Sequence, residues 1–530
     1  MDMKRFVACG VMMTACALAA QAADLVANGD FEQAKEGWPE AWPKHANAAY
    51  QEENGNHFVR QTAAGPDTLV MLYKSVPLPK GAAAFKLSFR ARWDGVKPGK
   101  QKWHDARIMI DFKDAAGKKL PGGPGHPAFK GSSKGAWETR TLGLVVPPEA
   151  ATLEIMPTLF NAAEGTLDFD DLSLEPIPLD EAGFVTYTLS ERLPDTPGCK
   201  SAELAVKGNR LVSRSDGREV WLQGVAIASL EWSAGGDNIL KSVTNALTQW
   251  YANAIRLAVK SDFWFGRGPW QNDKGVKYRA LVDEVVRQCE QRGAWAVIDL
   301  HEYRAPEQKH ADFWRDVATR YANHPGVLFG LLNEPHVVSW EVWRNGGWVE
   351  DKPKAKDGVF AENKEAVKRF HSVGMQRLLD AARKTGARNV ASAGGLDWGY
   401  DLSGVLQGYA LADASGNGVM YESHVYPWKR EWQAKFLDAA AQYPILIGEV
   451  GCQPERMPFI PPEAHEMPET WAPDMLGCIQ KYRLNWTAWC FHPKASPCLL
   501  LDWDYTPTPY WGVPAKAALH GQPFDMKTMR

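Results

Sequence analysis

The chain has 530 residues, of which 45% are hydrophobic and 23% are charged, and its formal net charge is −3 with a pI near 6.5. These proportions are those of a soluble globular protein, and the length favours two domains over one core. The near-neutral charge argues against nucleic acid or an anionic membrane surface as the main partner.

The first segment, residues 1–22, is predicted to be a signal peptide. Two basic residues, Lys4 and Arg5, precede an apolar stretch that ends at Ala20, and Ala20-Gln21-Ala22 forms an A-x-A-like cleavage site. A membrane anchor is the alternative, but the stretch is short for a bilayer span, and no other stretch is long and apolar enough for one. A lipoprotein attached through Cys16 is a minor alternative, because Met13 fits such a site poorly. We therefore expect a secreted or periplasmic protein without a membrane span.

Export permits disulfides. Two of the eight cysteines lie in the signal peptide, and the other six allow fifteen pairings, among which the sequence cannot choose. A loop staple near the C-terminus is one expectation, because four cysteines gather there: Cys452, Cys478, Cys490 and Cys498. None of the cysteines or histidines has zinc-ligand spacing.

Residues 23–178 are predicted to form an all-β sandwich. Short alternating runs such as 84–90 and 107–112 are separated by turns rich in glycine and proline, for example 120–125. The chain is rich in tryptophan, with 23 residues, and exposed Trp suits the flat apolar faces of sugar rings. Four tryptophans of this segment are candidates for stacking on sugars, although a core role is expected for most of them: Trp38, Trp42, Trp93 and Trp103.

After a proline-containing linker at 179–204, residues 205–530 alternate between strand and helix signals. Helices are expected at 278–292, 361–384 and 431–441. Eight β-α units match a (β/α)8 TIM barrel, whose active site lies at the carboxyl ends of the strands. A doubly wound open sheet is the competing fold, but no glycine-rich phosphate loop follows an early strand. The eight apolar runs expected to form strands are 220–226, 254–259, 295–300, 327–332, 389–393, 419–426, 445–448 and 485–491.

Two of these strands end in a glutamate. The run 327–332 leads into Asn333-Glu334-Pro335, and the run 444–448 leads into Glu449. Both runs are too short for helices and are typical of buried parallel strands. Hydrolysis of a glycosidic bond with retention needs two such carboxyl groups about 5 Å apart, one as acid and base and the other as nucleophile.

Other strand ends carry residues that this chemistry could use: Arg256, His301, Asn333, His424, Tyr426 and Trp489. Each alone has a structural explanation, such as an ion pair or a buried hydrogen bond. Their joint placement at one end of the predicted barrel is more specific, because chance would scatter them over both ends.

With these residues, the second domain resembles glycoside hydrolase family 5, a cellulase-like family of clan A. That resemblance implies that Glu334 is the acid/base and Glu449 the nucleophile. Arg256 and Tyr426 would favour the charged form of Glu449. The other residues would contact the sugar. Asn333 would donate to the 2-hydroxyl, and Trp489 would stack under a sugar ring. His301 and His424 would bind hydroxyl groups or orient the carboxylates.

The sequence departs from the family pattern in places. Glu302 follows His301 where many relatives carry a neutral residue. Glu422 shares a strand face with His424, where we expect it to pair with an arginine beneath the site. Long loops at 336–360 and 452–471 build subsites, so substrate specificity carries over poorly.

The ends of the first domain, 26–32 and 167–174, resemble the first and last strands of jelly-roll carbohydrate-binding modules. That resemblance implies a possible structural calcium ion, for which Glu32 and Asp171 are the candidate ligands.

The main hypothesis is a secreted retaining hydrolase of a β-linked polysaccharide, similar to an endo-β-1,4-glucanase or mannanase. The alternatives are an exo-acting β-glycosidase on oligosaccharides and a non-catalytic carbohydrate-binding protein. Catalysis should need no cofactor, because the sequence has no zinc ligand set, phosphate loop or dinucleotide fingerprint. We expect a monomer that uses its first domain to hold the substrate.

Overall fold

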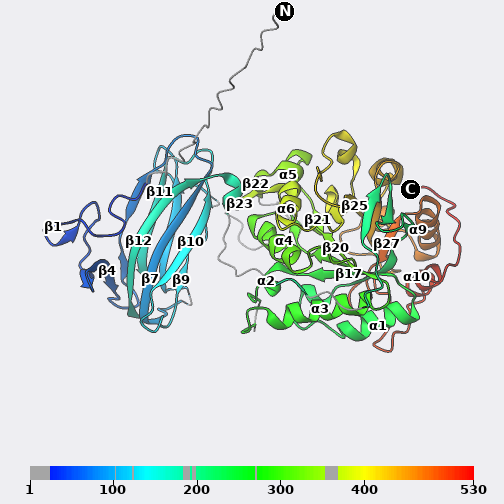
Figure 1. The fold of residues 1–530 in the computed structure, drawn as a ribbon, viewed down its shortest axis with the longest axis horizontal. Coiled ribbons are helices and arrows are strands. Elements are labelled where there is room, and N and C mark those ends of the chain that lie inside the picture. Colours follow the sequence, from blue (N-terminus) through cyan, green and yellow to red (C-terminus); the bar gives the residue numbers. More distant parts are fainter. Residues whose placement is uncertain are drawn as a thin grey trace, which may run out of the picture. The chain divides into compact units, whose positions relative to one another are not determined.

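The structure is a computed structural model that describes residues 24–101, 103–121, 124–182, 191–193, 198–268, 271–351 and 368–530. The chain divides into two compact units, Met1–Ala182 and Gly183–Arg530 (Figure 1). The division falls inside the predicted linker. The predicted signal peptide, residues 1–22, lies outside the described residues.

The N-terminal unit is built from two antiparallel sheets. Two very short strands, β1 (Ala34–Lys35) and β2 (Trp38–Pro39), pair separately. One sheet has the order β10 (Glu138–Val145), β7 (Ala84–Lys97), β12 (Glu164–Ile177), β4 (Asn56–Thr62) and β3 (Ala48–Glu53). The other has the order β5 (Leu69–Met71), β11 (Thr152–Phe160), β8 (Ala106–Lys113) and β9 (Ala128–Phe129), and β6 (Lys74–Pro77) also pairs with β11.

Side chains of β7 show how this unit forms its core. Phe85, Leu87 and Phe89 are fully buried in its hydrophobic cluster, whereas Arg90 and Arg92 lie on the other face of the strand. Those arginines pair across the sheet with aspartates of β12. The alternation confirms the predicted all-β domain.

Three of the four candidate stacking tryptophans belong to this core. Trp38, Trp42 and Trp93 are at most 8% exposed, so they cannot offer a ring face to a sugar. Trp103 is 53% exposed and lies against Phe160, with ring centroids 5.5 Å apart. Only Trp103 of the four keeps the geometry of a stacking residue.

The C-terminal unit contains a closed barrel of eight parallel strands, which confirms the predicted fold. In spatial order they are β16 (Gln223–Ile227), β17 (Ala254–Val259), β18 (Trp295–Leu300), β20 (Val327–Gly330), β24 (Ala391–Gly394), β25 (Val419–Val425), β26 (Ile445–Val450) and β27 (Asn485–Ala488). Spatial order follows chain order, as successive β-α units require.

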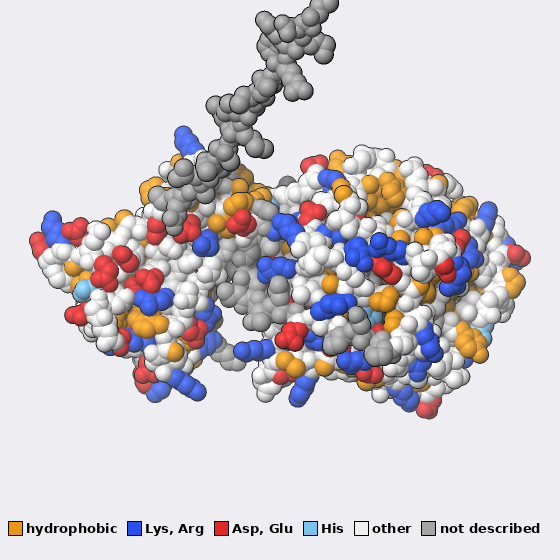
Figure 2. All heavy atoms as spheres, viewed as in Figure 1, with side chains coloured by type: hydrophobic (Ala, Val, Ile, Leu, Met, Phe, Trp, Pro, Cys, Tyr) orange, Lys and Arg blue, Asp and Glu red, His pale blue; other side chains and the backbone are white. Residues whose placement is uncertain are grey.

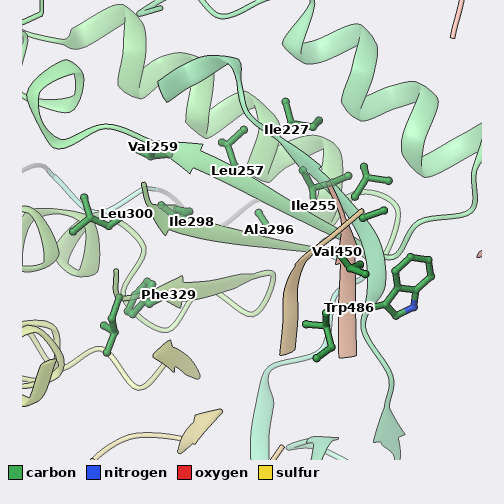
Figure 3. Close-up of a cluster of buried hydrophobic side chains, with 14 of the residues drawn as sticks. Ile227, Ile255, Leu257, Val259, Ala296, Ile298, Leu300, Phe329, Val450 and Trp486 are labelled. Atoms are coloured by element: carbon green, nitrogen blue, oxygen red, sulfur yellow. The ribbon is translucent and has the colours of Figure 1, made fainter. Parts of the chain in front are cut away.

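Both faces of the barrel strands are buried, which explains their continuous apolar runs. Outward residues such as Ile255, Leu257 and Ile298 belong to the large cluster between strands and helices (Figure 3). Inward residues such as Val297 and Leu328 form a separate cluster inside the barrel.

Helices follow most strands of the barrel. The longer ones are α1 (Ile239–Gln249), α3 (Val276–Glu290), α4 (Gln308–Arg320), α6 (Gly374–Arg383), α9 (Pro468–Tyr482) and α10 (Gly512–Leu519). Short ones are α2 (Ser261–Trp264), α5 (Trp340–Asn345), α7 (Leu396–Gly399) and α8 (Asp438–Ala440), which a π-helical turn, Gln433–Leu437, precedes.

A small antiparallel sheet packs its apolar side chains against the inward residues of the barrel. It consists of β13 (Leu204–Lys207), β14 (Arg210–Ser213) and β15 (Glu219–Val220). Leu204 and Leu211 join the cluster inside the barrel. This sheet precedes the first barrel strand, so it covers the end opposite to the carboxyl ends.

The helix predicted at 361–384 is wrong at its start. Residues Lys368–Ser372 form strand β23, which pairs with β22 (Gly347–Asp351), and the helix begins only at Gly374. Cross-strand pairing of a long loop has overridden the local helical pattern. Residues 361–367 lie outside the described residues.

The expected disulfide staple near the C-terminus is also wrong, because all six described cysteines are free thiols. Four of them are buried, including Cys452, Cys478 and Cys490. Within the described part of the chain, no helix combines the length and apolar character that a bilayer crossing needs. The visible face carries side chains of both charges on each unit (Figure 2).

Candidate active site

Alternation along the strands sends a set of polar side chains into the barrel. On β17, Ile255 and Leu257 face the helices, so Arg256 between them faces inward. By the same alternation Asp299 and Glu422 follow the inward apolar residues Val297 and Met420. These polar side chains therefore lie next to the apolar cluster inside the barrel, on the side of the carboxyl ends of the strands.

Arg256 is fully buried and forms the centre of this layer. Its Nε donates to Glu422 Oε1 at 2.8 Å, its Nη1 to Glu449 Oε1 at 3.2 Å and its Nη2 to Asn333 Oδ1 at 2.6 Å. Nη2 also lies 3.1 Å from Asp299 Oδ1. A buried guanidinium with this many acceptors fixes the position of each acceptor.

Two glycines make room for these large groups. A Cβ at Gly448 would lie 1.9 Å from Glu422 Oε1, and one at Gly330 would lie 3.0 Å from the Asp299 Cα. The packing around Glu422 therefore requires glycine at position 448, and the packing around Asp299 leaves little room for a side chain at position 330.

Glu334 and Glu449 face each other across the barrel mouth. One oxygen from each of them and a ring nitrogen of His424 all lie within 4.8 Å of one another. Tyr426 donates its hydroxyl to Glu449 Oε2 at 2.6 Å, and His424 Nδ1 lies 3.0 Å from Glu334 Oε1. The oxygen spacing is short enough for retention and too short for an intervening water on an inverting route.

The two carboxyl groups differ in their pKa values. Burial raises the pKa of Glu334, and the negative charge of Glu449 adds to the increase against the opposing hydrogen bond from His424. Burial would also raise the pKa of Glu449, but the positive charges of His424 and Arg256 outweigh it and lower that pKa. The protonated form is thus favoured for Glu334 and the ionised carboxylate for Glu449.

His424 sits between three carboxylates. Its Nε2 lies 3.1 Å from Glu422 Oε1, while its Nδ1 lies between Glu334 and Glu449. Burial lowers its pKa, but Glu449 and the bonds to Glu334 and Glu422 outweigh burial and raise it to about 10. The surrounding carboxylates therefore favour the imidazolium form of His424.

Glu422 pairs with Arg256 as expected from the sequence. Burial would raise its pKa, but Arg256 and His424 outweigh burial and lower the pKa to about 2. Ser392 Oγ donates to its second oxygen at 2.7 Å. The shift favours the ionised form of Glu422 beneath the site. Of Glu334, Glu422 and Glu449, only Glu334 has a raised pKa.

His301 and Trp489 lie parallel, with ring centroids 5.5 Å apart and an interplanar angle of 5°. His301 Nδ1 is 2.7 Å from Asp299 Oδ2. Burial alone would lower the pKa of His301, but the hydrogen bond and the negative charge of Asp299 outweigh burial and raise that pKa. Trp489 donates Nε1 to the Ser496 oxygen at 3.2 Å. The two rings form a fixed wall of the site.

Sequence reasoning missed several residues of this region. Asp299 could have been found, since it lies two residues before His301 on the same strand face. Glu231 could not, because it lies in a short 3-10 helix after the first strand, Ser229–Glu231, and not at a strand end. Its carboxylate accepts from Tyr303 at 2.6 Å and lies 3.6 Å from His301. Trp398 lies in the short helix α7 after the fifth barrel strand, so it too is outside the strand ends.

Asn333 holds one unused donor. Its Oδ1 accepts from Arg256, but its buried Nδ2 has no hydrogen-bond partner among the described residues. Burying an unsatisfied donor costs about 1–3 kcal/mol, and such a cost is expected where a ligand supplies the acceptor.

The candidate calcium ligands of the N-terminal unit are already paired. Glu32 Oε2 lies 2.7 Å from His57 Nδ1, and Asp171 Oδ2 lies 2.6 Å from Arg90 Nε. A calcium ion bound to either carboxylate would have to displace these nitrogen groups. Among the described residues, the trio of Glu334, His424 and Glu449 is the one cluster of three side chains with metal-ligand spacing.

The barrel unit is similar to a known protein family and to several characterised proteins. The family model described as cellulase (glycosyl hydrolase family 5) matches residues 214–495. An endoglucanase of Microbulbifer is 21% identical over 333 residues, which are 60% of this chain and 57% of the relative. Endoglucanase CelA of Streptomyces lividans is 24% identical over 265 residues, 48% of this chain and 50% of the relative. The chain thus spans about half the length of these relatives.

Two solved structures are also similar to this chain. A β-glucanase of Saccharophagus degradans in complex with cellotetraose has a TM-score of 0.49 and 23% identity, covering 64% of this chain and 98% of that one. The catalytic domain of a Thermobifida fusca endoglucanase has a TM-score of 0.44 and 17% identity, covering 60% and 97%.

Proposed function

The chain belongs to glycosyl hydrolase family 5, whose model matches more than half of its length, and we propose that it hydrolyses a β-linked glucan by double displacement. The observation that carries this proposal is the pair Glu334 and Glu449. Their oxygens approach within 4.8 Å, and their pKa values shift in opposite directions.

In the first step Glu449 attacks the anomeric carbon while Glu334 protonates the leaving oxygen. Arg256 and Tyr426 donate to Glu449 and keep it ionised before the attack. The bond from Tyr426 weakens as the carboxylate becomes an ester and its charge disappears. In the second step Glu334, now a carboxylate, takes a proton from the water that releases the sugar.

The remaining site residues serve the sugar in this proposal. The unpaired Asn333 Nδ2 donates to the 2-hydroxyl, a contact that strengthens as the oxocarbenium-like state forms. Trp489 offers an apolar ring face, and His301 Nε2 is directed toward hydroxyl groups, because its Nδ1 is held by Asp299. No step needs a cofactor.

The substrate class rests on the relatives, several of which are endoglucanases. We propose β-1,4-glucan as the first substrate to test, with mannan and mixed-linkage glucans as comparisons. A non-catalytic carbohydrate-binding role is disfavoured, because a degenerate site rarely keeps both carboxylates and their supporting arginine and tyrosine.

The test is a screen for new reducing ends across purified polysaccharides, with product lengths resolved and the anomer formed first followed by NMR. The proposal expects β-anomers from a β-glucan and products of several lengths. Short products of one size would favour an exo-acting glycosidase instead. α-Anomers would mean inversion and would overturn the double displacement.

Three further properties remain proposals. The chain is exported by its signal peptide, acts as a monomer, and uses the N-terminal unit to hold glycan through Trp103, the exposed member of its candidate set. Edman sequencing of the mature protein, light scattering and glycan-affinity gels test them in turn.

A further inference from the structure

A carboxylate that none of the proposed catalytic steps uses lies beside the candidate active site. Glu231 ends the short 3-10 helix Ser229–Glu231, just after the first barrel strand, and its side chain is 22% exposed. Among the described residues, His301 is the one basic side chain within ion-pair distance of Glu231. A largely covered carboxylate without a hydrogen-bonded cation loses solvation energy, which points to a ligand as its missing partner.

The position of Glu231 is fixed by its surroundings. Tyr278 donates its hydroxyl to the main-chain oxygen of the preceding Leu230 at 2.9 Å. Tyr303, in β19 (Tyr303–Arg304), donates to Glu231 Oε1 at 2.6 Å. Burial raises the pKa of Tyr303, and the charge of Glu231 adds to the increase, so the phenol stays protonated and keeps donating. One carboxylate oxygen is thus held, and the other, Oε2, lies on the side of His301.

The space between Glu231 and His301 suits a hydroxyl group. Oε2 and Nε2 lie 3.6 Å apart, too far for a direct hydrogen bond, and neither atom forms one with any residue that the structure describes. Burial would lower the pKa of His301, but the bond from Nδ1 to Asp299 raises it and favours a second proton on Nε2. A single oxygen can lie about 2.8 Å from both atoms. A hydroxyl accepts and donates at one oxygen, so it matches this pair of a donor and an acceptor.

The neighbouring strand identifies the hydroxyl group. Asn333, which donates to the 2-hydroxyl of the attacked sugar in the proposed function, lies at the end of the next barrel strand. Its amide donates to the oxygen of Leu300, the residue before His301, at 3.0 Å. Side chains from adjacent strand ends meet adjacent hydroxyl groups of one sugar ring. In a β-1,4-linked chain the 4-oxygen carries the preceding glucose, so the 3-hydroxyl is the free group beside the 2-hydroxyl.

We propose that Glu231 is a specificity-determining residue whose Oε2 accepts a hydrogen bond from the 3-hydroxyl of the attacked glucose, while His301 Nε2 donates to the same hydroxyl. This inference rests on the proposed function and narrows it to one linkage. A glucose joined to the preceding sugar through its 3-oxygen has no proton for Glu231 and brings a second ring into the 3.6 Å space. The site therefore accepts a β-1,4-linked glucose at the attacked position and rejects a β-1,3-linked one.

Three substrates with the same leaving group test this role. They are nitrophenyl β-cellobioside, its analogue without the 3-hydroxyl on the ring that carries nitrophenol, and nitrophenyl β-laminaribioside, which is β-1,3-linked. The release of nitrophenol gives kcat/KM. Removing the hydroxyl should lower the wild-type kcat/KM about 10- to 100-fold, because two hydrogen bonds to charged groups are lost. The laminaribioside should react about 100-fold more slowly than the cellobioside, since its 3-oxygen is blocked as well.

Two variants connect this loss to Glu231. Glu231→Ala should lower kcat/KM for the cellobioside about tenfold and cause no further loss on the deoxy analogue, where the contact is already absent. Glu231→Gln keeps one oxygen for Tyr303 but turns an NH2 group toward His301, so it should lose activity in the same pattern.

Glu219→Ala is the matched control. Glu219 is a half-exposed carboxylate of β15, in the small sheet at the opposite end of the barrel, where it pairs with Arg483. This variant should change kcat/KM for none of the three substrates.

An equal loss from Glu231→Ala on the cellobioside and on the deoxy analogue would show that Glu231 only supports the fold, which overturns the inference. A wild type that releases nitrophenol equally fast from both disaccharides would overturn the linkage preference. Melting temperatures identify a variant that does not fold, and Glu231→Gln with the wild-type ratios then decides the outcome. If the wild type cleaves neither these glycosides nor any β-glucan, the proposed function itself fails.

Discussion

The Tyr426 hydroxyl donates to Oε2 of Glu449 over 2.6 Å, so the proposed nucleophile accepts a hydrogen bond from the residue that directly follows the neighbouring strand β25. Burial, together with the charge of Glu449, raises the pKa of Tyr426 well above its usual value, so the phenol stays protonated and keeps donating.

This bond predicts a shift in the pH–rate profile. Tyr426→Phe removes a donor to the charged form of Glu449, so the pKa of Glu449 rises and the acid limb of kcat/KM moves to higher pH. A bond to a charged group is worth about 1.5–3 kcal/mol, which corresponds to about one to two pH units. The alkaline limb, which reports Glu334, should move little. Tyr421→Phe is the control, because that tyrosine faces the other side of β25 and binds the Leu411 amide. An unmoved acid limb would contradict the role of Tyr426.

The two carboxyl groups should respond differently to the leaving group. Glu334→Gln should lower turnover of cellotetraose about 10²–10⁴-fold, yet retain formation of the glycosyl-enzyme from β-cellobiosyl fluoride, which needs little protonation. Glu449→Gln should lose both reactions. A 2-fluoro-sugar trap followed by peptide mass spectrometry should label Glu449; a label on Glu334 would reverse the roles.

Glu422 should matter for stability. Glu422→Gln removes one buried counter-ion that Arg256 and His424 share, and breaking such a pair typically costs about 3–5 kcal/mol of unfolding free energy. The folded-state pKa is lowered to about 2, so the ionised group stabilises the fold above the ordinary carboxylate pKa. The difference between variant and wild type, measured by urea denaturation, should therefore shrink as pH falls toward 2. Glu219→Gln, at a half-exposed pair with Arg483, should cost at most about 1 kcal/mol.

Chelation should leave catalysis intact. Proton transfer and nucleophilic attack come from the two glutamates, so EDTA should not change the rate well below the melting temperature. If the N-terminal unit binds calcium at Glu32 or Asp171, EDTA should lower the melting temperature alone. Complete loss of activity at low temperature, restored by a transition metal, would mean that Glu334, His424 and Glu449 hold a metal ion.

The N-terminal unit should bind glycan by itself. It has its own hydrophobic core, so residues 24–182 should fold alone. In affinity gels containing β-glucan, this fragment should be retarded, and Trp103→Ala should abolish the retardation without changing the melting temperature. Trp42→Ala should instead destabilise the fragment, because that ring is buried. A fragment with no retardation would be a spacer.

The barrel could be predicted because its strands are buried on both faces, so each one appears as an uninterrupted apolar run such as 254–259. The site residues could be predicted because parallel strands bring their ends together, which made Arg256, Glu334 and Glu449 neighbours without any knowledge of the loops. All eight predicted site residues meet at this end of the barrel.

Loop residues could not be predicted in the same way. The sequence around Trp398 gives no sign that Asp397 and Trp398 adopt left-handed backbone, because Lys429, distant along the chain, holds that turn. The strand at Lys368–Ser372 was missed for the same reason, since its partner is another segment of the loop. The sequence could not separate the buried tryptophans of the sandwich from the exposed one, because Trp occurs both in a hydrophobic core and at an exposed sugar-binding position.

The six free thiols have a practical consequence. No disulfide joins the described parts of the chain, so the sandwich and the barrel rest on packing, hydrogen bonds and ion pairs. The mature protein should therefore fold in a reducing bacterial cytoplasm without an oxidase or isomerase, and its yield there should not depend on added oxidant. Dithiothreitol in the storage buffer should be harmless, and thiol-reactive dyes should reach the half-exposed Cys199 and Cys498 well before the buried cysteines.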